Sequence, residues 1–367
     1  MARKLKSDRM LFYTTIVLAF SGLVMVYSAS SMLTPQDSSQ SGQFLVKQLL
    51  FTVLGLAAMA VTMKFNYHLY RVPTVVWVTL GVTILALAAV LIVGPKINGT
   101  RRWFRLAGVG IQPSELAKIA MVMFAAAVLE QRMDRIRELR YALGPIAVAL
   151  AVVVALILFE PDFGSAVAVL AVVVMMVFAA GIPIRYLALI GLGLAPLLVG
   201  VALWEPYRVR RFLIFLHPEQ DPRGDGFQIL QSLIAVGTGG VTGRGLGESI
   251  QKMFYLPYPH TDFIYAVTAE ELGLIGASLM LACFAIVTWR GLRVASRAPD
   301  AFGSLLAIGL TAMIAVQAFV NISVVLGMMP TKGIPLPFVS AGGSSLIVSL
   351  AGMGMLLNIS QQASVEG

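Results

Sequence analysis

The sequence has few charged side chains for its length. Asp, Glu, Lys and Arg make up 12% of its 367 residues, while hydrophobic residues make up 58%. A soluble globular domain carries about twice that share of charge and needs fewer apolar side chains to fill its core. The shortage of charge therefore excludes a soluble globular protein and predicts an integral membrane protein, in agreement with a mean hydropathy of +0.85.

Cysteine is nearly absent, and so are the sequence features of nucleotide binding. The one cysteine, Cys283, lies within an apolar run, which excludes an intramolecular disulfide bond or a cysteine-based metal site. The sequence shows neither a glycine-rich nucleotide-binding loop nor an internal repeat of about 20 to 50 residues. We therefore do not expect this chain to use ATP.

Apolar runs of about 20 residues, long enough to cross about 30 Å of hydrocarbon as helices, recur along the whole chain. They predict a single bundle of ten transmembrane helices. The first run follows Arg3, Lys4, Lys6 and Arg9, and the small residues at 28–30 raise the alternative of a cleaved signal peptide; its length and the runs that follow favour a retained helix. The predicted spans are 11–30, 44–63, 74–94, 113–129, 141–159, 164–181, 185–204, 263–288, 302–327 and 343–358.

The basic N-terminus predicts the orientation, since cytoplasmic loops carry the excess of Lys and Arg. Ten spans then place both termini in the cytoplasm and two long basic loops outside. A basic cluster beside the bilayer suits an anionic headgroup, above all a diphosphate, because guanidinium groups bind phosphate bidentately. Adhesion to anionic phospholipid and an inverted topology are the alternatives. The outer basic residues are Lys96, Arg101, Arg102, Arg105, Arg208, Arg210, Arg211, Arg223, Arg244 and Lys252.

Ionisable residues inside apolar spans are costly and mark either a site or a buried ion pair. Pro113 suits the first turn of a helix, which places Glu115 and Lys118 three residues apart on one face. We expect them to form an ion pair in the bundle interior, either as a structural pair or as a substrate contact. Asp162 lies in a very short outer turn, where it is either an ordinary turn residue or part of a site.

Another carboxylate, Asp262, lies where the second long outer loop meets the next span. Pro257 and Pro259 prevent an earlier helix start, so Thr261 is expected to cap the helix and Asp262 to fall in its first turn. The helix N-terminus favours the ionised carboxylate, whereas a low dielectric raises the carboxyl pKa. These opposing effects suit a base that works near neutral pH; the alternative is a capping residue.

Two further polar features lie near the same predicted span. Glu270 and Glu271 follow in its helix, and we expect them to be structural, with partners from another helix. The segment 329–345 carries three prolines and three glycines in apolar surroundings. Non-helical backbone at membrane depth is tolerated only where it is buried in protein or lines a cavity. We therefore expect this segment to form part of a pocket wall, with Lys332 as a phosphate contact.

Four blocks of sequence, in order along nearly the whole chain, resemble one known family. They are 98–103 with 112–118, 160–164, 207–252, and 259–273 continuing in 330–345. The chain resembles the SEDS proteins (shape, elongation, division and sporulation), which are bacterial peptidoglycan glycosyltransferases. The runs 330–338 and 251–257 are more similar to the division-type member than to the elongation-type member, and the sporulation paralogue is close to the division type. Ala341 departs from the Tyr that is usual there, which bears on how tightly this part of the pocket holds substrate.

The resemblance implies an all-α polytopic membrane protein, a single domain over 1–367 with ten transmembrane helices and a large extracytoplasmic loop, 205–262, between helices 7 and 8. It implies that lipid II, an undecaprenyl-diphosphate-linked disaccharide pentapeptide, is both donor and acceptor, with inversion of the α-linked donor to a β-1,4-linked glycan. Asp262 is the implied base for the acceptor 4-hydroxyl. The implied substrate-binding residues are Arg101, Arg102, Glu115, Lys118, Asp162, Arg208, Arg210, Gln231, Lys332, Ser340 and Ser344.

The resemblance also implies a divalent cation, Mg²⁺ or Mn²⁺, bound jointly with the diphosphate, and no nucleotide. The implied partners are a class B penicillin-binding protein transpeptidase and other division proteins of the membrane, and no nucleic acid; the implied place is the bacterial cytoplasmic membrane at the septum. A lipid II flippase and a scaffold for division proteins are the alternatives. A translocation route needs polar residues through the depth of the bundle, whereas the informative residues here lie in its outer half, which favours the enzyme.

Overall fold

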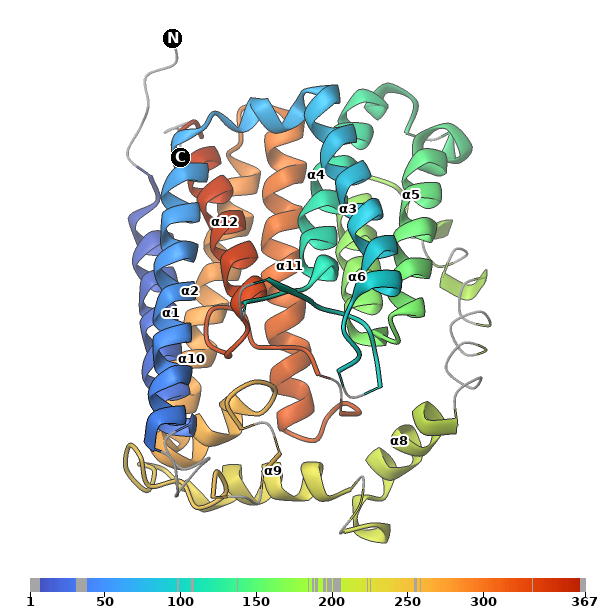
Figure 1. The fold of residues 1–367 in the computed structure, drawn as a ribbon. Helices are drawn as coiled ribbons and strands as arrows, with labels where there is room; N and C mark the ends of the chain where they lie inside the picture. The colour runs from blue at the N-terminus through green and yellow to red at the C-terminus, as the bar shows by residue number, and fades with distance from the viewer. Residues whose placement is uncertain are drawn as a thin grey trace.

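The computed structural model describes residues 7–363 except 31–37, 98, 107–108, 137, 184, 187, 189–190, 194–195, 197–199, 201–205, 223, 225, 254–255, 258 and 332. These residues form a bundle of long helices with one small β-hairpin (Figure 1). The long helices are α1 (Arg9–Ser30), α2 (Ser38–Lys64), α3 (Pro73–Val93), α4 (Pro113–Gln131), α5 (Leu139–Phe159), α6 (Phe163–Ala179), α10 (Ile264–Ser296), α11 (Ala301–Val325) and α12 (Gly343–Ser360).

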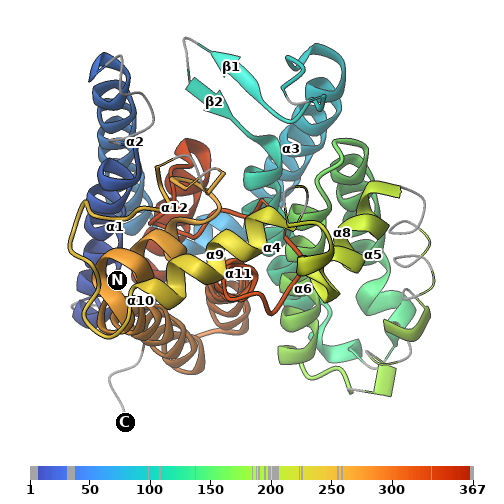
Figure 2. The same cartoon turned by 90° about the horizontal axis from the view of Figure 1, so that it is seen from below.

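The shorter elements connect these helices. They are η1 (Tyr67–Arg71), β1 (Phe104–Leu106), β2 (Val109–Ile111), η2 (Met133–Arg135), α8 (Pro206–Leu216), η3 (Pro218–Gln220) and α9 (Phe227–Thr238). β1 and β2 pair antiparallel, with Phe104 opposite Ile111. The hairpin projects from the bundle between α2 and α3, whereas α8 and α9 lie across one end of the bundle (Figures 1 and 2).

The predicted all-α membrane fold is confirmed. Seven described helices are long and apolar enough to cross a membrane: α1, α2, α3, α5, α10, α11 and α12. α4 carries the charged residues Glu115, Lys118 and Glu130, and α6 has only 17 residues, yet both coincide with predicted spans. The predicted span 185–204 lies largely outside the described residues, so the count of ten stays a prediction.

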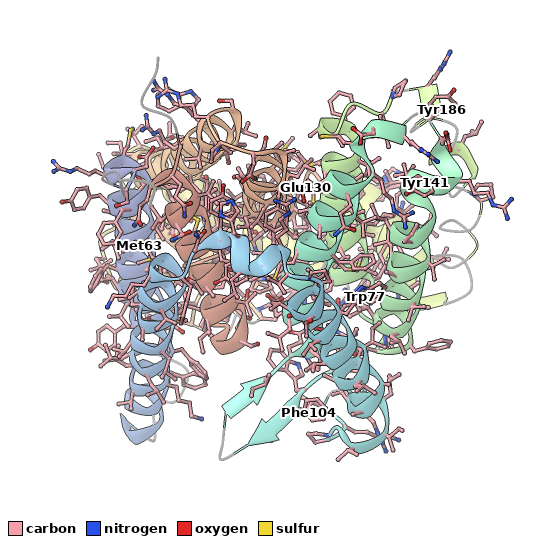
Figure 3. The ribbon with its side chains drawn as sticks, turned by 90° about the horizontal axis from the view of Figure 1, so that it is seen from above. Met63, Trp77, Phe104, Glu130, Tyr141 and Tyr186 are labelled. Atoms are coloured by element: carbon pink, nitrogen blue, oxygen red, sulfur yellow. The ribbon has the colours of Figure 1, made fainter. Side chains whose placement is uncertain are left out.

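Helices α4 and α11 form the centre of the bundle, with α1, α2, α10 and α12 on one side and α3, α5 and α6 on the other (Figure 1). Small residues permit this close packing. At Gly309 of α11, a Cβ atom would lie 2.6 Å from both Met176 Sδ of α6 and Val122 Cγ1 of α4. Trp77 of α3, which is labelled in Figure 3, meets Phe124 of α4 edge-on, with ring centroids 5.3 Å apart.

The described ends of the chain lie together at the end of the bundle opposite α8 and α9. The main-chain N–H of Asp8 donates to Ser360 Oγ (3.1 Å), and its carboxylate forms an ion pair with Arg290 of α10 (2.5 Å). At the same end, Arg71 of η1 pairs with Glu130 of α4 (2.9 Å), which is labelled in Figure 3. Two termini on one side agree with an even number of spans.

Candidate active site

Asp262 lies in a turn, two residues before the start of α10. The predicted placement of Asp262 in the first turn, with Thr261 as the cap, is wrong: Phe263 is the N-cap residue, and no side chain caps this helix. Hydrogen bonds from a distant segment to the main-chain carbonyls of residues 260 and 261 explain the later start. Ser340 Oγ donates to the carbonyl of Thr261 (2.6 Å), and the N–H of Ala341 donates to the carbonyl of His260 (2.9 Å).

The segment 330–341 supports Asp262 from the other side. Asn321 Nδ2 of α11 donates both to the carbonyl of Asp262 (2.9 Å) and to that of Ile334 (2.8 Å). A Cβ atom at Gly333 would lie 3.1 Å from Asp262 Oδ2, so the glycine lets the main chain pass beside the carboxylate. Leu336 and Ile334 are buried. Its described residues are thus largely buried in protein, one of the two settings expected for such backbone, while its role as a pocket wall stays a prediction.

Two charged residues act on Asp262. The side chain is partly exposed, and burial by the surrounding protein raises its carboxyl pKa to about 6; the Arg211 guanidinium lowers this pKa and the Asp162 carboxylate raises it. Arg211 extends from α8 and donates to the carbonyl of Thr331 (3.1 Å). Burial therefore takes the role predicted for it, while Arg211 replaces the helix N-terminus as the opposing influence.

Asp162 is buried and caps α6. Its Oδ1 accepts the N–H of Ser165 (3.0 Å), and its Oδ2 accepts Ser165 Oγ (2.7 Å) and Gln112 Nε2 (3.0 Å). The interpretation of Asp162 as a turn residue is therefore correct for the local structure. Gln112 also brings in the loop before α4, because its N–H donates to Ser344 Oγ of α12 (3.3 Å). The structure therefore joins the starts of α4, α6 and α12 around one carboxylate.

Glu160 is a residue of this region that the sequence reasoning left out. Its side chain is fully buried, and neither carboxylate oxygen accepts a hydrogen bond from any residue that the structure describes. Burial, and then the neighbouring Asp162 carboxylate, raise the Glu160 pKa to about 8. A carboxylate at the end of an apolar span was the available signal. Arg102 lies beside it and donates to the main-chain carbonyls of Glu160 (2.7 Å) and Pro161 (2.6 Å).

The arginines predicted to bind phosphate are dispersed. Arg101 donates to the carbonyls of Leu91 (3.2 Å) and Ile92 at the end of α3, the usual partners of a cation at a helix C-terminus. Arg210 is exposed and pairs with Asp221 (2.9 Å). The side chain of Arg208 and the whole of Lys332 lie outside the described part of the chain. A phosphate-binding role for these residues stays a prediction.

The predicted Glu115–Lys118 ion pair is confirmed: Lys118 Nζ lies 2.7 Å from Glu115 Oε1, and both side chains are buried in the bundle. The remaining predicted residue, Gln231, is half buried on α9. Its neighbour Ser232 donates to the carbonyl of Val325 (2.8 Å) and so ties α9 to the end of α11.

Lys252 does not belong to an outer basic cluster. Its side chain is fully buried, and Nζ pairs with Glu271 Oε1 (2.9 Å) and donates to Ser28 Oγ of α1 (3.1 Å). The expectation that Lys252 faces a headgroup is therefore wrong, because a carboxylate 19 residues ahead in the chain takes the charge. The structural role predicted for Glu271 is confirmed, but its cationic partner comes from the preceding loop and only Ser28 from another helix.

Carboxylates that could hold a metal ion are scarce here. Over the residues the structure describes, no group of three or more His, Cys, Asp or Glu side chains could hold one. Both oxygens of Asp162 already accept hydrogen bonds, and Glu160 is fully buried. The described residues do not fit a resident divalent cation.

Comparison with known proteins agrees with the motifs. A family model for FtsW, RodA and SpoVE, described as cell cycle protein, matches residues 8–365. The chain is 43% identical to the probable peptidoglycan glycosyltransferase FtsW of Trichlorobacter lovleyi over 353 residues, 96% of this chain and 93% of that relative. It is 42% identical to the stage V sporulation protein E of Bacillus subtilis over 363 residues, 98% of both chains.

Two solved structures resemble the fold over its full length. One belongs to a structure that describes the structural coordination of polymerization and crosslinking by a peptidoglycan synthase complex. It has a TM-score of 0.79 and 34% identity, and the match covers 96% of this chain and 97% of that one. The other is the rod shape determining protein RodA of Thermus thermophilus, with a TM-score of 0.72, 30% identity and 98% coverage of both chains.

Proposed function

Because this chain belongs to the FtsW, RodA and SpoVE family of cell cycle proteins, we propose that it is a peptidoglycan glycosyltransferase that polymerises peptidoglycan for cell division. The observation that carries the proposal is the placement of Asp262. It is a partly exposed carboxylate with a pKa of about 6. Its main chain is held by side-chain donors: Asn321 of α11 binds the carbonyl of Asp262, and Ser340 binds that of Thr261. A base near neutral pH is what the reaction requires.

The proposed substrate is lipid II, as donor and as acceptor. Asp262 takes the proton of the acceptor 4-hydroxyl, whose oxygen forms a bond to the donor's anomeric carbon. The bond from that carbon to the diphosphate oxygen breaks, and its electron pair leaves with the diphosphate. Attack opposite the leaving group inverts an α-linked donor to a β-1,4 product. A base of this kind supplies about 10² to 10⁴ in rate, so orientation and charge neutralisation must supply the rest.

Arg211 is the described cation best placed to neutralise the departing diphosphate. It acts electrostatically on Asp262 and donates to the carbonyl of Thr331, and a guanidinium suits a diphosphate because it can bind phosphate bidentately. Arg102 is the second, since it lies beside Glu160 in the same region. Mg²⁺ or Mn²⁺ stays a prediction, and no step of this mechanism depends on it.

We place the protein in the bacterial cytoplasmic membrane, at the septum, with α8 and α9 on the outer side. A class B penicillin-binding protein is the proposed partner, because a solved relative belongs to a peptidoglycan synthase complex named for polymerization and crosslinking. Ser-x-x-Lys spacing occurs in the outer loop at Ser249 and Lys252, but both side chains are buried and bound to Glu270 and Glu271. They form no exposed nucleophile, so crosslinking falls to the partner.

The test is polymerisation of labelled lipid II by the purified protein with its cognate transpeptidase. Asp262→Asn keeps the side-chain size but removes the base, so glycan synthesis should fall by at least about 10² while lipid II still binds. The control is Asp300→Asn, because Asp300 accepts the N–H of Gly303 (2.6 Å) as the cap of α11 at the other end of the bundle. Because Asp300 also accepts the Tyr67 hydroxyl (2.7 Å), this variant should lose stability. The turnover of its folded protein should stay near normal.

A folded Asp262→Asn protein that makes glycan at the wild-type rate would end the catalytic assignment. Movement of lipid II between the leaflets of vesicles by a wild-type protein that forms no glycan would instead identify the flippase.

A further inference from the structure

Helix α10 is interrupted at Gly273, whose φ of 66° and ψ of −165° are not helical. In an unbroken helix, each N–H would donate to the carbonyl four residues earlier. At this break, residues 239–245 of the preceding loop (the inserted segment) supply the hydrogen-bond partners of these main-chain groups instead. Four main-chain hydrogen bonds make the exchange: Leu274 N–H to Gly240 O (2.9 Å), Ile275 N–H to Val241 O (3.2 Å), Arg244 N–H to Glu270 O (3.0 Å) and Gly245 N–H to Glu271 O (3.0 Å).

Glycines make this insertion sterically feasible. A Cβ atom would lie 2.1 Å from the Glu271 carbonyl oxygen if placed on Gly243, and 1.9 Å from the Ala269 carbonyl oxygen if placed on Gly239. On Gly273 itself, a Cβ atom would lie 2.3 Å from the N atom of Gly243. These close contacts are with main-chain atoms, which cannot rotate away as a side chain can. The inserted segment and the main chain of α10 therefore fit together only while these positions lack side chains.

Two buried carboxylates fasten the loop to α10 just before the break. Glu271 pairs with Lys252 (2.9 Å). Glu270 accepts hydrogen bonds from Ser249 Oγ (2.5 Å) and from the N–H of Ile250 (3.0 Å). Both carboxylates are fully buried, so each would be costly without these donors. The side chains and the main chain thus tie the loop to the same turn of the helix.

The helical stretch that these contacts hold, Ile264 to Leu272, begins beside Asp262. Nine residues of helix span roughly 13 Å and are stiff, so a change of tilt at one end is transmitted to the other. The chain leaves α9 at Thr238 and enters the break in α10 as the inserted segment. It then continues to Asp262, just before the start of α10. Asn321 and Ser340 support Asp262 on the opposite side.

We propose that Gly243 and the Lys252–Glu271 pair are positioning residues for Asp262, which hold the first two turns of α10 so that the carboxylate meets the acceptor hydroxyl. This role rests on the proposed polymerase function. It assigns to the long outer loop a catalytic task beyond substrate contact, because the loop forms the base's support on the α10 side.

Gly243→Ala and Gly181→Ala make a matched pair of variants. Both glycines have a positive φ, 81° and 93°, so alanine is strained at either position; but a Cβ on Gly243 meets the α10 backbone, whereas a Cβ on Gly181, which follows α6, meets nothing within 4 Å. Gly243→Ala should lower kcat for lipid II polymerisation by about 10-fold or more, since a misplacement of about 1 Å costs up to about 10². KM should change by less than about 3-fold, and Gly181→Ala should stay within about 2-fold of wild type.

The pH profile separates positioning from loss of folded protein. If Gly243→Ala moves Asp262 out of its burial and away from Arg211 and Asp162, its pKa falls from about 6 toward the ordinary carboxyl value, and the acidic limb of the rate profile moves to lower pH. A variant that only reduces the amount of folded enzyme lowers the whole curve and leaves the limb in place. Lys252→Met combined with Glu271→Gln removes both buried charges together and should give the same shifted limb.

A readout without turnover uses Asp262→Cys in a Cys283→Ala background. Adding Gly243→Ala should speed maleimide modification at position 262 by about 3-fold or more, while adding Gly181→Ala should not. An active wild type, together with a folded Gly243→Ala protein of unchanged kcat, pH limb and modification rate, would overturn the positioning role alone. A wild type that forms no glycan would overturn the proposed function, and the catalytic positioning with it.

Discussion

At the scale of single residues, the centre of the site is the Asp262 carboxylate, whose pKa is shifted in opposite directions by burial and by a nearby cation. Burial raises the Asp262 pKa to about 6, and Arg211 prevents a larger rise. Asp162 is near enough to act on the same pKa, yet it is itself saturated with hydrogen bonds and caps α6. One carboxylate is therefore available for proton transfer while its neighbour is committed to structure.

The raised pKa of Asp262 predicts how the rate of glycan synthesis depends on pH. Burial raises the pKa of Asp262 above its ordinary range to about 6, so the carboxyl is protonated and inactive as a base below about pH 6. The rate of glycan synthesis should rise about 10-fold per pH unit up to that point and level off above it. Initial rates measured from pH 5 to pH 8 with saturating lipid II provide the test. A rate that is flat between pH 5 and pH 7 would contradict the assignment.

At the scale of elements, α4 combines charge with burial. Pro113 starts the helix, and its first turn carries Glu115, whose partner Lys118 lies one turn further on. Both side chains are almost completely excluded from the surface. Removing one member of such a pair leaves the other charge buried and unpaired, which costs about 3 to 5 kcal/mol, whereas replacing both with neutral side chains of similar volume costs far less.

Glu115→Gln alone should therefore lower the stability of the protein in detergent by about 3 to 5 kcal/mol, and Glu115→Gln with Lys118→Met should restore most of it. Thermal unfolding measures the stability, and lipid II polymerisation decides between the two roles open for this pair. A double variant that is stable but inactive makes the pair a substrate contact. Recovery of both properties makes it structural.

At the scale of the whole molecule, the two ends of the bundle differ. One end carries both described termini, fastened by Asp8 to Ser360 and to Arg290. The other end carries α8, α9 and the loop that supports Asp262 (Figure 2). The proposed function requires that this second end face outward, where the glycan is made.

The orientation can be tested with single cysteines in a Cys283→Ala background. A cysteine replacing Glu219, in η3, should react with a membrane-impermeant maleimide on intact cells. Cysteines replacing Asp134, in η2, or Gln362 should react only after the cells are opened. The opposite pattern would reverse the topology and remove the outward-facing site.

The sequence by itself determined the features that depend on composition and short spacing. Hydropathy located the membrane helices that the structure describes, because each span is one continuous apolar run. The Glu115–Lys118 pair followed from a spacing of three residues on one helix, and the burial of 330–341 followed from the cost of unpaired backbone in a membrane.

Only the tertiary structure decided how distant segments share their charges and hydrogen bonds. Lys252 turns inward to Glu271, Arg101 and Arg102 bind main-chain carbonyls, and α10 begins late. The insertion of residues 239–245 at Gly273 belongs here too. Each of these depends on which backbone groups are left without partners once the helices have packed, and that is a property of the assembled bundle rather than of any local pattern.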